Sequence, residues 1–179
     1  MRTVQQDLAR FFYIYGIDKK NNYLRLMQYS FHPRFNYIFN YRLAKYLSNK
    51  NISILPKIIL LINQFLYGIE FSMDTKIGGG LFIPHTYGII IGADEIGSNA
   101  TIYQNVTLGA KILDVPFHKE NRPIIGNDVT IATGSVILGR ITISDNVIVA
   151  ANSVVLHSVP ENVIVAGAPA KILKRIIDK

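Results

Sequence analysis

Apolar residues recur at every sixth position through the second part of the chain, from Phe71 to Val155. An α-helix repeats its apolar positions about every 3.6 residues and a half-buried strand about every two, so neither element produces this spacing. A period of six is typical of a parallel β-helix, in which each short strand sends one side chain inward and a turn leads to the next wall. The predicted inward positions are Phe71, Ile77, Ile83, Ile89, then with a shift of one Ile96, Ile102, Leu108, and then Ile125, Ile131, Ile137, Ile143, Val149 and Val155.

The residues between these anchors support the same structure. A small or β-branched residue stands four positions after most anchors, which completes the six-residue pattern. The expected turns are rich in Gly, Asn and Asp, which favour a positive φ or bond to their own backbone. These turn residues are Gly92, Asp94, Gly97, Asn99, Gly126, Asn127, Asp128, Gly134, Asp145, Asn146 and Asn152.

The first part of the chain, residues 1–68, has helical spacing instead. Apolar residues recur at intervals of three and four, as one face of a helix requires. Pro33 and Pro56 are typical of first helical turns, and Gly16 and residues 48–53 separate the helices. We expect three or four short helices here. The residues that recur at helical spacing are Leu24, Met27, Phe31, Phe35, Ile38, Phe39, Leu43 and Tyr46, and Arg42 falls at the same spacing.

The repeat is interrupted once, between Leu108 and Ile125, by a segment with two prolines and several charged residues. Such a segment cannot continue the walls, and we predict a loop over residues 110–123 that carries function on a rigid scaffold. The predicted fold class is mainly β: a small α-helical region (1–68) precedes a parallel β-helix (69–166). A basic, apolar tail (167–179) closes the open end, as the terminal unit of a repeat array must.

The charge of the chain is concentrated at its start. The net charge is +7, and residues 1–70 hold ten Lys or Arg against three acids, whereas residues 71–179 hold nine of each. The basic, aromatic helices therefore suit a peripheral contact with an anionic membrane surface or an acidic partner, the alternative being a solvated face. No basic motif of an RNA-binding type is present, so we expect no nucleic acid partner.

No signal peptide is recognisable, and the most apolar window, residues 52–71, is interrupted by polar residues. We therefore expect a cytoplasmic protein, with membrane association through the helices left open. The chain has no cysteine, which excludes disulfides and thiolate chemistry. Its four histidines lack metal-ligand spacing, so we predict no metal.

His85 is the candidate for chemistry, because it stands alone in the apolar run Ile77 to Gly92. Histidine accepts a proton near neutral pH without special tuning, since its unperturbed pKa is about 6.5. The alternative is a structural histidine held by hydrogen bonds. The regular frame on which it lies favours the general base.

Several segments together resemble the serine acetyltransferases and their relatives, the hexapeptide-repeat acyltransferases. The resemblance rests on IPHTYGIIIG, YQNVTLG, the loop before RPIIG, and VPENVIVAGAPAKI, and it covers about residues 68–175. It implies a left-handed β-helix with three hexapeptides per coil. It further implies a homotrimer that binds acetyl-coenzyme A between neighbouring chains.

The resemblance also implies roles for single residues. His85 corresponds to the catalytic base, and Glu70, fifteen positions earlier, to the carboxylate that orients it. A carboxylate on one imidazole nitrogen fixes the tautomer and stabilises the imidazolium. The residues that correspond to the coenzyme site are Gly109, Thr133 and Ala151 along the pantetheine arm, and Lys171, followed by Lys174 and Arg175, at the phosphates.

The positions that hold serine in the family differ here. Pro84 replaces the aspartate before the base, and Asn121 and Arg122 replace an Arg-His pair. A charged group buried without its counter-charge costs several kcal/mol. We therefore expect an acetyl-coenzyme A-dependent O-acetyltransferase that acts on a sugar hydroxyl in surface polysaccharide synthesis. The expected contacts with the acceptor are Tyr87, His118, Asn121 and Arg122. The alternatives are serine, with its carboxylate on Arg122, a transferase of another acyl or amino-acceptor type, and a β-helix scaffold without catalysis.

Overall fold

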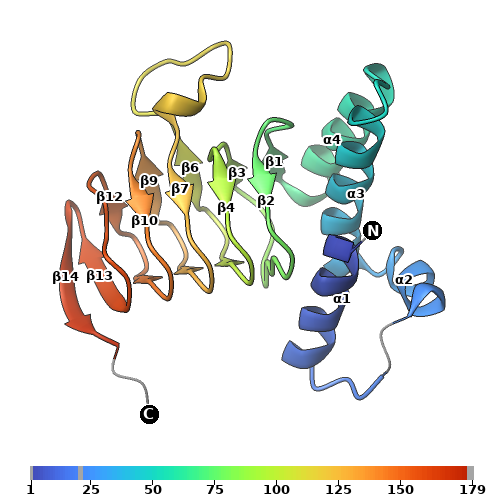
Figure 1. Ribbon diagram of the computed structural model, residues 1–179, viewed down its shortest axis with the longest axis horizontal. Coiled ribbons are helices and arrows are strands. Elements are labelled where there is room, and N and C mark those ends of the chain that lie inside the picture. Colours follow the sequence, from blue (N-terminus) through green and yellow to red (C-terminus); the bar gives the residue numbers. More distant parts are fainter. Residues whose placement is uncertain (1, 20–21, 177–179) are drawn as a thin grey trace.

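The computed structural model describes residues 2–19 and 22–176 and shows a helical region packed against one end of a β-solenoid (Figure 1). In the described part of the chain four α-helices come first, and all strands follow. The helices are α1 (Arg2–Ile14), α2 (Tyr23–Tyr29), α3 (Pro33–Ser48) and α4 (Ile54–Tyr67). The predicted breaks at Gly16 and at 48–53 and the first-turn positions of Pro33 and Pro56 agree with these bounds.

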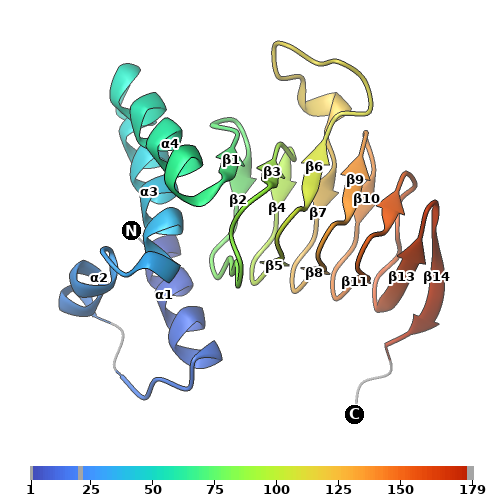
Figure 2. The same ribbon diagram turned by 180° about the vertical axis from the view of Figure 1, so that it is seen from behind.

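Three parallel sheets form the three walls of the solenoid, and Figure 2 shows their strands stacked along its length. The first wall holds β1 (Ile69–Phe71), β3 (Ile89–Ile91), β6 (Thr107–Gly109), β9 (Val136–Leu138) and β12 (Val154–Val155). The second wall holds β2 (Lys76–Ile77), β4 (Glu95–Ile96), β7 (Ile124–Ile125) and β10 (Thr142–Ile143). The third wall holds the parallel strands β5 (Thr101–Ile102), β8 (Thr130–Ile131), β11 (Ile148–Val149) and β13 (Val163–Gly167). Unlike the strands of the coils, β14 (Ala170–Arg175) pairs with β13 in the antiparallel direction at the end of this wall. The fold is a left-handed parallel β-helix. The period of six predicted the parallel β-helix, and the resemblance to the hexapeptide-repeat acyltransferases implied its left hand.

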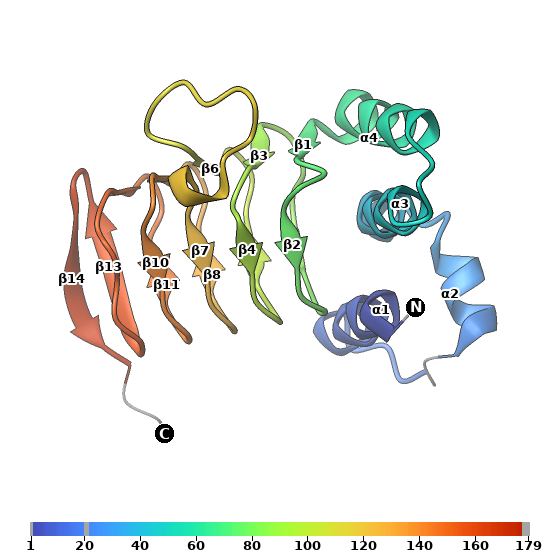
Figure 3. The same ribbon diagram turned by 45° about the horizontal axis from the view of Figure 1, so that its top comes forward.

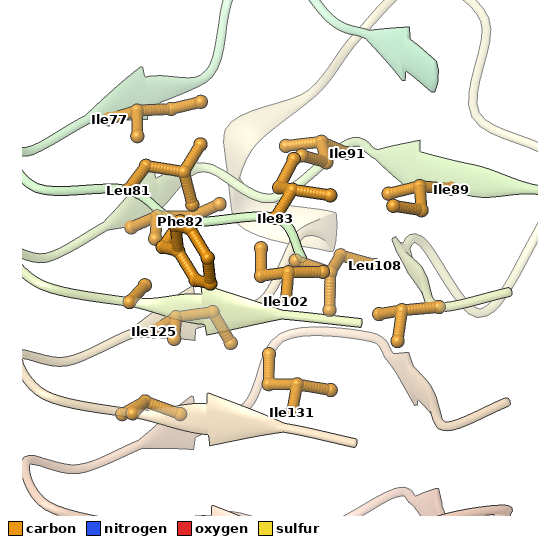
Figure 4. Close-up of a cluster of buried hydrophobic side chains, with 14 of the residues drawn as sticks. Ile77, Leu81, Phe82, Ile83, Ile89, Ile91, Ile102, Leu108, Ile125 and Ile131 are labelled. Atoms are coloured by element: carbon orange, nitrogen blue, oxygen red, sulfur yellow. The ribbon is translucent and has the colours of Figure 1, made fainter. Parts of the chain in front are cut away.

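The period of six has a direct structural cause. Ile125, Ile131 and Ile137 pair with the residues 18 positions later, so one coil is three hexapeptides. Each predicted anchor is buried, with at most 8% of its surface exposed. The anchors stack in rows inside the solenoid (Figure 4), where burial of each aliphatic side chain contributes about 1.5–3 kcal/mol.

The register of the ladder differs from the predicted count of six at one anchor. Ile89 is buried, but it pairs with Ile69, and the partner of Phe71 is Ile91. The inward positions therefore run from Ile83 to Ile91, a spacing of eight rather than six. The two additional residues fall in the turn that contains His85.

The loop over residues 110–123 interrupts the coil, but the strands before and after it keep their ladder pairing. Ile96 pairs with Ile125, 29 positions later, so eleven residues are added to a coil of 18. Figure 1 shows the loop standing out from the solenoid between β6 and β7, with a short 3-10 turn, Lys119–Asn121. The ladder continues below the loop because β6 pairs directly with β9.

The helical region covers the first coil through α1 and α3 (Figure 3). Tyr41 of α3 stacks on Phe71 with ring centroids 4.7 Å apart, and its hydroxyl donates to the Thr75 carbonyl at 2.8 Å. Tyr37 donates to the Ile83 carbonyl at 2.7 Å. These buried tyrosines fix the helices against the coil that holds the candidate base.

The predicted apolar face over 24–31 was wrong. Leu24, Met27 and Phe31 are exposed, whereas Leu26 is the buried residue of α2. The helix has seven residues and ends before Phe31. It is too short to present a continuous apolar face, so the apolar spacing across residues 24–31 does not correspond to one side of a helix.

Candidate active site

His85 lies in the turn that joins the third wall to the first. The turn begins after Phe82, which bridges to Thr101, and ends at β3. Tyr87 has φ of 81° and its N–H donates to the Tyr67 carbonyl at 2.8 Å. Gly68 makes this contact possible, because a Cβ there would stand 2.8 Å from Tyr87 Cα. The turn is thus fixed to the end of α4.

A hollow of about 450 Å³ opens beside His85, between the turn, α3 and α4. The histidine ring is exposed, and its centroid lies 6.5 Å from that of Tyr103 on the next coil. A hydroxyl-bearing ligand in the hollow would therefore reach the imidazole. The hollow is lined by Pro33, Arg34, Tyr37, Leu66, Tyr67, Ile83, Pro84, His85, Thr86 and Tyr87.

The corner that contains His85 continues along the solenoid, and we call it the histidine corner (residues 84–88, 103–106, 132–135 and 150–153). Backbone bonds stack its turns: Asn105 N–H donates to Tyr87 at 3.1 Å, and Asn152 N–H to Thr133 at 2.8 Å. Thr133 and Ala151 thus occupy the same corner as His85. The structure brings the predicted base together with two of the residues predicted to bind coenzyme A.

Gln104 belongs to this corner and was not predicted. Its carbonyl accepts the Thr133 hydroxyl at 3.1 Å and the Gly134 N–H at 3.1 Å. Its side-chain Oε1 is buried and has no hydrogen-bond partner among the described residues. A buried acceptor of this kind is a candidate contact for a ligand N–H.

Glu70 does not contact His85 in the described structure, where no hydrogen bond or ion pair joins the two residues. Glu70 is the outward residue of β1, since Ile69 and Phe71 point inward, and its ladder partner is Ile90. It lies on the outer surface of the first wall, whereas His85 lies at the edge of that wall. The dyad stays a prediction.

The loop is organised by Asp114, which the sequence analysis missed. Its side chain is 3% exposed and accepts hydrogen bonds from His118, Asn121 and Arg122. Burial raises the pKa of this carboxyl, but these hydrogen bonds outweigh that effect and hold it well below its usual range. The bond to Asp114, 2.6 Å from His118 Nδ1, raises the pKa of His118. Three of the four predicted acceptor residues, His118, Asn121 and Arg122, thus form one cluster around a carboxylate, whereas Tyr87 lies apart from them in the histidine corner.

Arg122 connects the loop to the solenoid. Its guanidinium stacks on Phe117 at 4.5 Å and donates through Nε to Asp114 at 2.9 Å. A Cβ on Gly92 would lie 3.1 Å from Arg122 Nη1, so the arginine rests directly against that glycine. Nη1 has no hydrogen bond within the described part of the chain, and it is therefore free to bind an anion.

The remaining predicted residues lie apart from the histidine corner. Gly109 is buried at the end of β6, next to Arg122, in the corner that joins the first wall to the second. We call this corner, with Gly92 and the loop, the loop corner. Lys171, Lys174 and Arg175 are exposed on β14. Within one chain the two corners stand at opposite edges of the first wall, and the described residues contain no cluster of three metal-ligating side chains.

The order of the loop should depend on pH through His118 and Asp114. The His118 contact is complete below the ordinary histidine pKa of 6.5 and is lost as pH rises through its raised pKa. The stabilisation of the loop by the ionised Asp114 is fully present above the ordinary aspartate pKa of 3.8 and is lost as pH falls through the lowered pKa of Asp114. We expect His118→Gln to be cleaved by trypsin at Lys111 or Lys119 about two- to fivefold faster than wild type below pH 6.5. The difference should vanish at higher pH, and a constant ratio would contradict the contact.

Comparison with known proteins agrees with this geometry. Residues 122–157 match the family described as bacterial transferase hexapeptide (six repeats). The chain is 41% identical over 139 residues to a serine acetyltransferase of Staphylococcus xylosus, covering 77% of this chain and 63% of that protein. The same enzyme from Staphylococcus aureus (strain Mu50) is also 41% identical over 139 residues, covering 77% of this chain and 64% of the relative. The chain spans slightly less than two thirds of the length of these relatives.

Solved structures agree as well. The crystal structure of Neisseria gonorrhoeae serine acetyltransferase has a TM-score of 0.81 at 26% identity, over 99% of this chain and 67% of that one. Serine acetyltransferase from Brucella abortus in complex with coenzyme A has a TM-score of 0.77 at 28% identity, over 97% and 67%. Fold and repeat thus define a left-handed β-helix of the transferase hexapeptide class. Within that class, the chain is similar to the serine acetyltransferases over the matched 139 residues and in its fold.

Proposed function

We propose that the protein is an O-acetyltransferase that moves an acetyl group from acetyl-coenzyme A to the hydroxyl of serine. The observation that carries this proposal is the histidine corner, where His85 borders an open hollow and shares a stacked edge with Thr133 and Ala151. The serine acetyltransferases at 41% identity support the reaction and the acceptor. The earlier expectation of a sugar acceptor has no support among them.

In the proposed reaction His85 takes the proton of the acceptor hydroxyl while the oxygen attacks the thioester carbonyl. The bond from carbon to sulfur then breaks, and the imidazolium returns the proton to the leaving thiolate. General-base catalysis of this kind contributes about 10²- to 10⁴-fold in rate. No covalent enzyme intermediate is needed, because one base serves both proton transfers.

Coenzyme A is proposed to run along the histidine corner. Thr133 and Ala151 have small side chains there, which let a pantetheine arm approach the backbone. Gly109 has a buried backbone without a side chain at the loop corner. Lys171, with Lys174 and Arg175, gives β14 an exposed positive charge for the phosphates.

A homotrimer would complete this site. Within one chain the histidine corner and the loop corner are separated by the first wall, so His85 and Arg122 face different edges. Packing of solenoids side by side would bring the histidine corner of one chain to the loop corner of the next. We propose this arrangement as the reason why one chain holds two halves of a site.

Arg122 is the proposed anchor for the serine carboxylate. Its Nε and Nη2 are held by Asp114, which leaves Nη1 preorganised for an acidic group. His118 and Asn121 are fixed by the same carboxylate, at 2.6 and 3.1 Å. Tyr87 is exposed in the turn that contains His85, and it would contact the acceptor from the side opposite Arg122.

A saccharide hydroxyl is the second candidate acceptor, because the hollow has no acidic side chain among its lining residues. Pro84 stands before the base, so the ammonium group of serine would find no counter-charge in the hollow. Tyr37, Tyr67 and Tyr87 line it instead. Apolar aromatic faces with hydroxyl groups suit an uncharged sugar ring.

Release of coenzyme A separates these acceptors. We expect turnover of acetyl-coenzyme A with free serine, and we expect Arg122→Met to raise the KM for serine at least about tenfold, since a charged hydrogen bond is lost. The measurement is thiol release with serine and with a panel of sugars. Turnover on sugars alone would replace serine by the second candidate, and no turnover on either would contradict acetyl transfer to these acceptors.

A further inference from the structure

The outward face of α4 is apolar over its whole length. Fourteen residues form the helix, and Pro56 and Asn63 are the ones that it buries, on the side toward α3. On the opposite side Ile54 is 71% exposed, Leu61 is 65% exposed and Phe65 is 87% exposed. We use the name α4 face for Ile54, Ile58, Leu61, Ile62 and Phe65.

A solvated helix normally turns charged and polar residues outward. The α4 face does the reverse, and Lys57 is the single charged residue in the helix. Figure 3 shows α4 beside α3 at the edge of the helical region, with its last turn leading into β1 of the first coil. Neither the helical region nor the solenoid therefore covers this face in the described chain. A contiguous exposed apolar surface of this kind marks an interaction site.

The charged residues of α2, α3 and α4 have one sign. From Lys19 to Ile69 the sequence holds eight Lys or Arg and no acid. Lys50 and Lys57 are exposed at the start of α4. Arg34 is exposed at the other end, where it lines the same hollow as Leu66. Cations thus flank the apolar surface at both ends.

The combination of an apolar surface and flanking cations indicates which partner binds the α4 face. A second copy of the α4 face would bring like charges together, which is unfavourable. An anionic bilayer surface matches both properties, because apolar side chains enter the acyl boundary while lysines and arginines meet the phosphates. At 1.5 Å per residue the helix is about 21 Å long, shorter than the hydrocarbon core of about 30 Å. None of the helices in the described ranges has the length and hydrophobicity needed to traverse a bilayer.

We propose that the α4 face docks the protein on an anionic lipid bilayer, with α4 parallel to the membrane plane. Leu66 and Tyr67, at the end of α4, line the hollow that contains His85. Docking therefore places the candidate active site beside the lipid headgroups. The proposal is independent of the acetyl transfer, since lipid binding needs neither substrate.

Flotation with vesicles tests the proposal on the full chain without substrates. We expect binding to vesicles of phosphatidylcholine and phosphatidylglycerol, and much weaker binding to phosphatidylcholine alone. Leu61→Ser together with Phe65→Ser should lower the partition coefficient at least about tenfold. Lys50→Glu and Lys57→Glu should each lower it about fivefold or more, and added salt should weaken binding.

Matched controls lie at the other end of the solenoid. Leu173 on β14 is 65% exposed, as Leu61 is, and Leu173→Ser should leave binding unchanged. Arg140→Glu, at an exposed turn, is the control for charge. Circular dichroism verifies that all variants are folded. Equal vesicle binding by wild type and the Leu61, Phe65 variant would overturn the proposal. A lower mass of that variant in lipid-free solution would overturn it too, because a second copy would then cover the face.

Discussion

Replacement of His85 by alanine is expected to lower kcat for acetyl transfer by about 10²- to 10⁴-fold, with the fold intact. The side chain is exposed in its turn and its ring packs against none of the core, so its removal leaves no cavity. The loss would come from the proton transfer alone. The measurement is coenzyme A release at saturating acceptor and saturating acetyl-coenzyme A.

His157→Ala is the matched control. His157 is also exposed in a turn of the solenoid, but it lies after β12, outside the histidine corner. The control should keep the activity of wild type. If His85→Ala turned over as fast as His157→Ala, His85 would not be the base, and a purely structural solenoid would account better for the chain.

The β-helix could be predicted from sequence because its signal is local and repeated. Each anchor from Ile125 to Val155 lies within one hexapeptide and faces the core for the same reason, so six agreeing positions specify the frame. The loop followed from the same regularity, since residues 110–123 are where the repeat stops. His85 was found because it is a lone imidazole in an apolar run.

The sequence could not predict contacts that depend on residues inserted into the six-residue repeat. The two additional residues around His85 move the ladder partner of Phe71 from Ile89 to Ile91, and a count of six cannot detect this local spacing of eight. Asp114 was missed because its partners are close in sequence but meet only when the loop folds back on itself. Nothing in the spacing of a loop distinguishes a buried carboxylate from a solvated one.

In the helical region, too, the sequence did not reveal contacts between residues that are far apart in the chain. The apolar face predicted at residues 35–46 agrees with α3 only at its start, where Phe35 and Ile38 are buried. Leu43 and Tyr46 were wrong, because they are exposed, and Tyr41 and Ala44 are buried instead. The ion pair that joins this region to the solenoid links Asp7 to Arg42, 35 positions apart, and then to Gly80. No periodicity relates these positions, so only the structure reveals the pair.

Asp7→Ala is expected to destabilise the protein by about 3–5 kcal/mol, the cost of leaving a buried charge without its partner. The Asp7 side chain is fully buried and accepts two bonds from Arg42, at 2.8 and 3.1 Å. The same carboxylate accepts the N–H groups of Gly80 at 2.7 Å and Leu81 at 3.1 Å. Its removal leaves the Arg42 guanidinium without its counter-charge, bonded only to the carbonyls of Ile77 and Gly78, and leaves two backbone donors unsatisfied where α1, α3 and the first coil meet.

Urea unfolding followed by the helical signal in circular dichroism measures this loss. Asp18→Ala is the control, because Asp18 is exposed and substitution of a surface acid changes stability by about 0.5 kcal/mol or less. Asp7→Asn keeps the shape and the acceptor oxygen but not the charge, so it should fall between the two. A loss for Asp7→Ala no larger than that for Asp18→Ala would show that the helices are held to the solenoid by the tyrosine and apolar contacts alone. The pair would then contribute to the orientation of α1 rather than to stability.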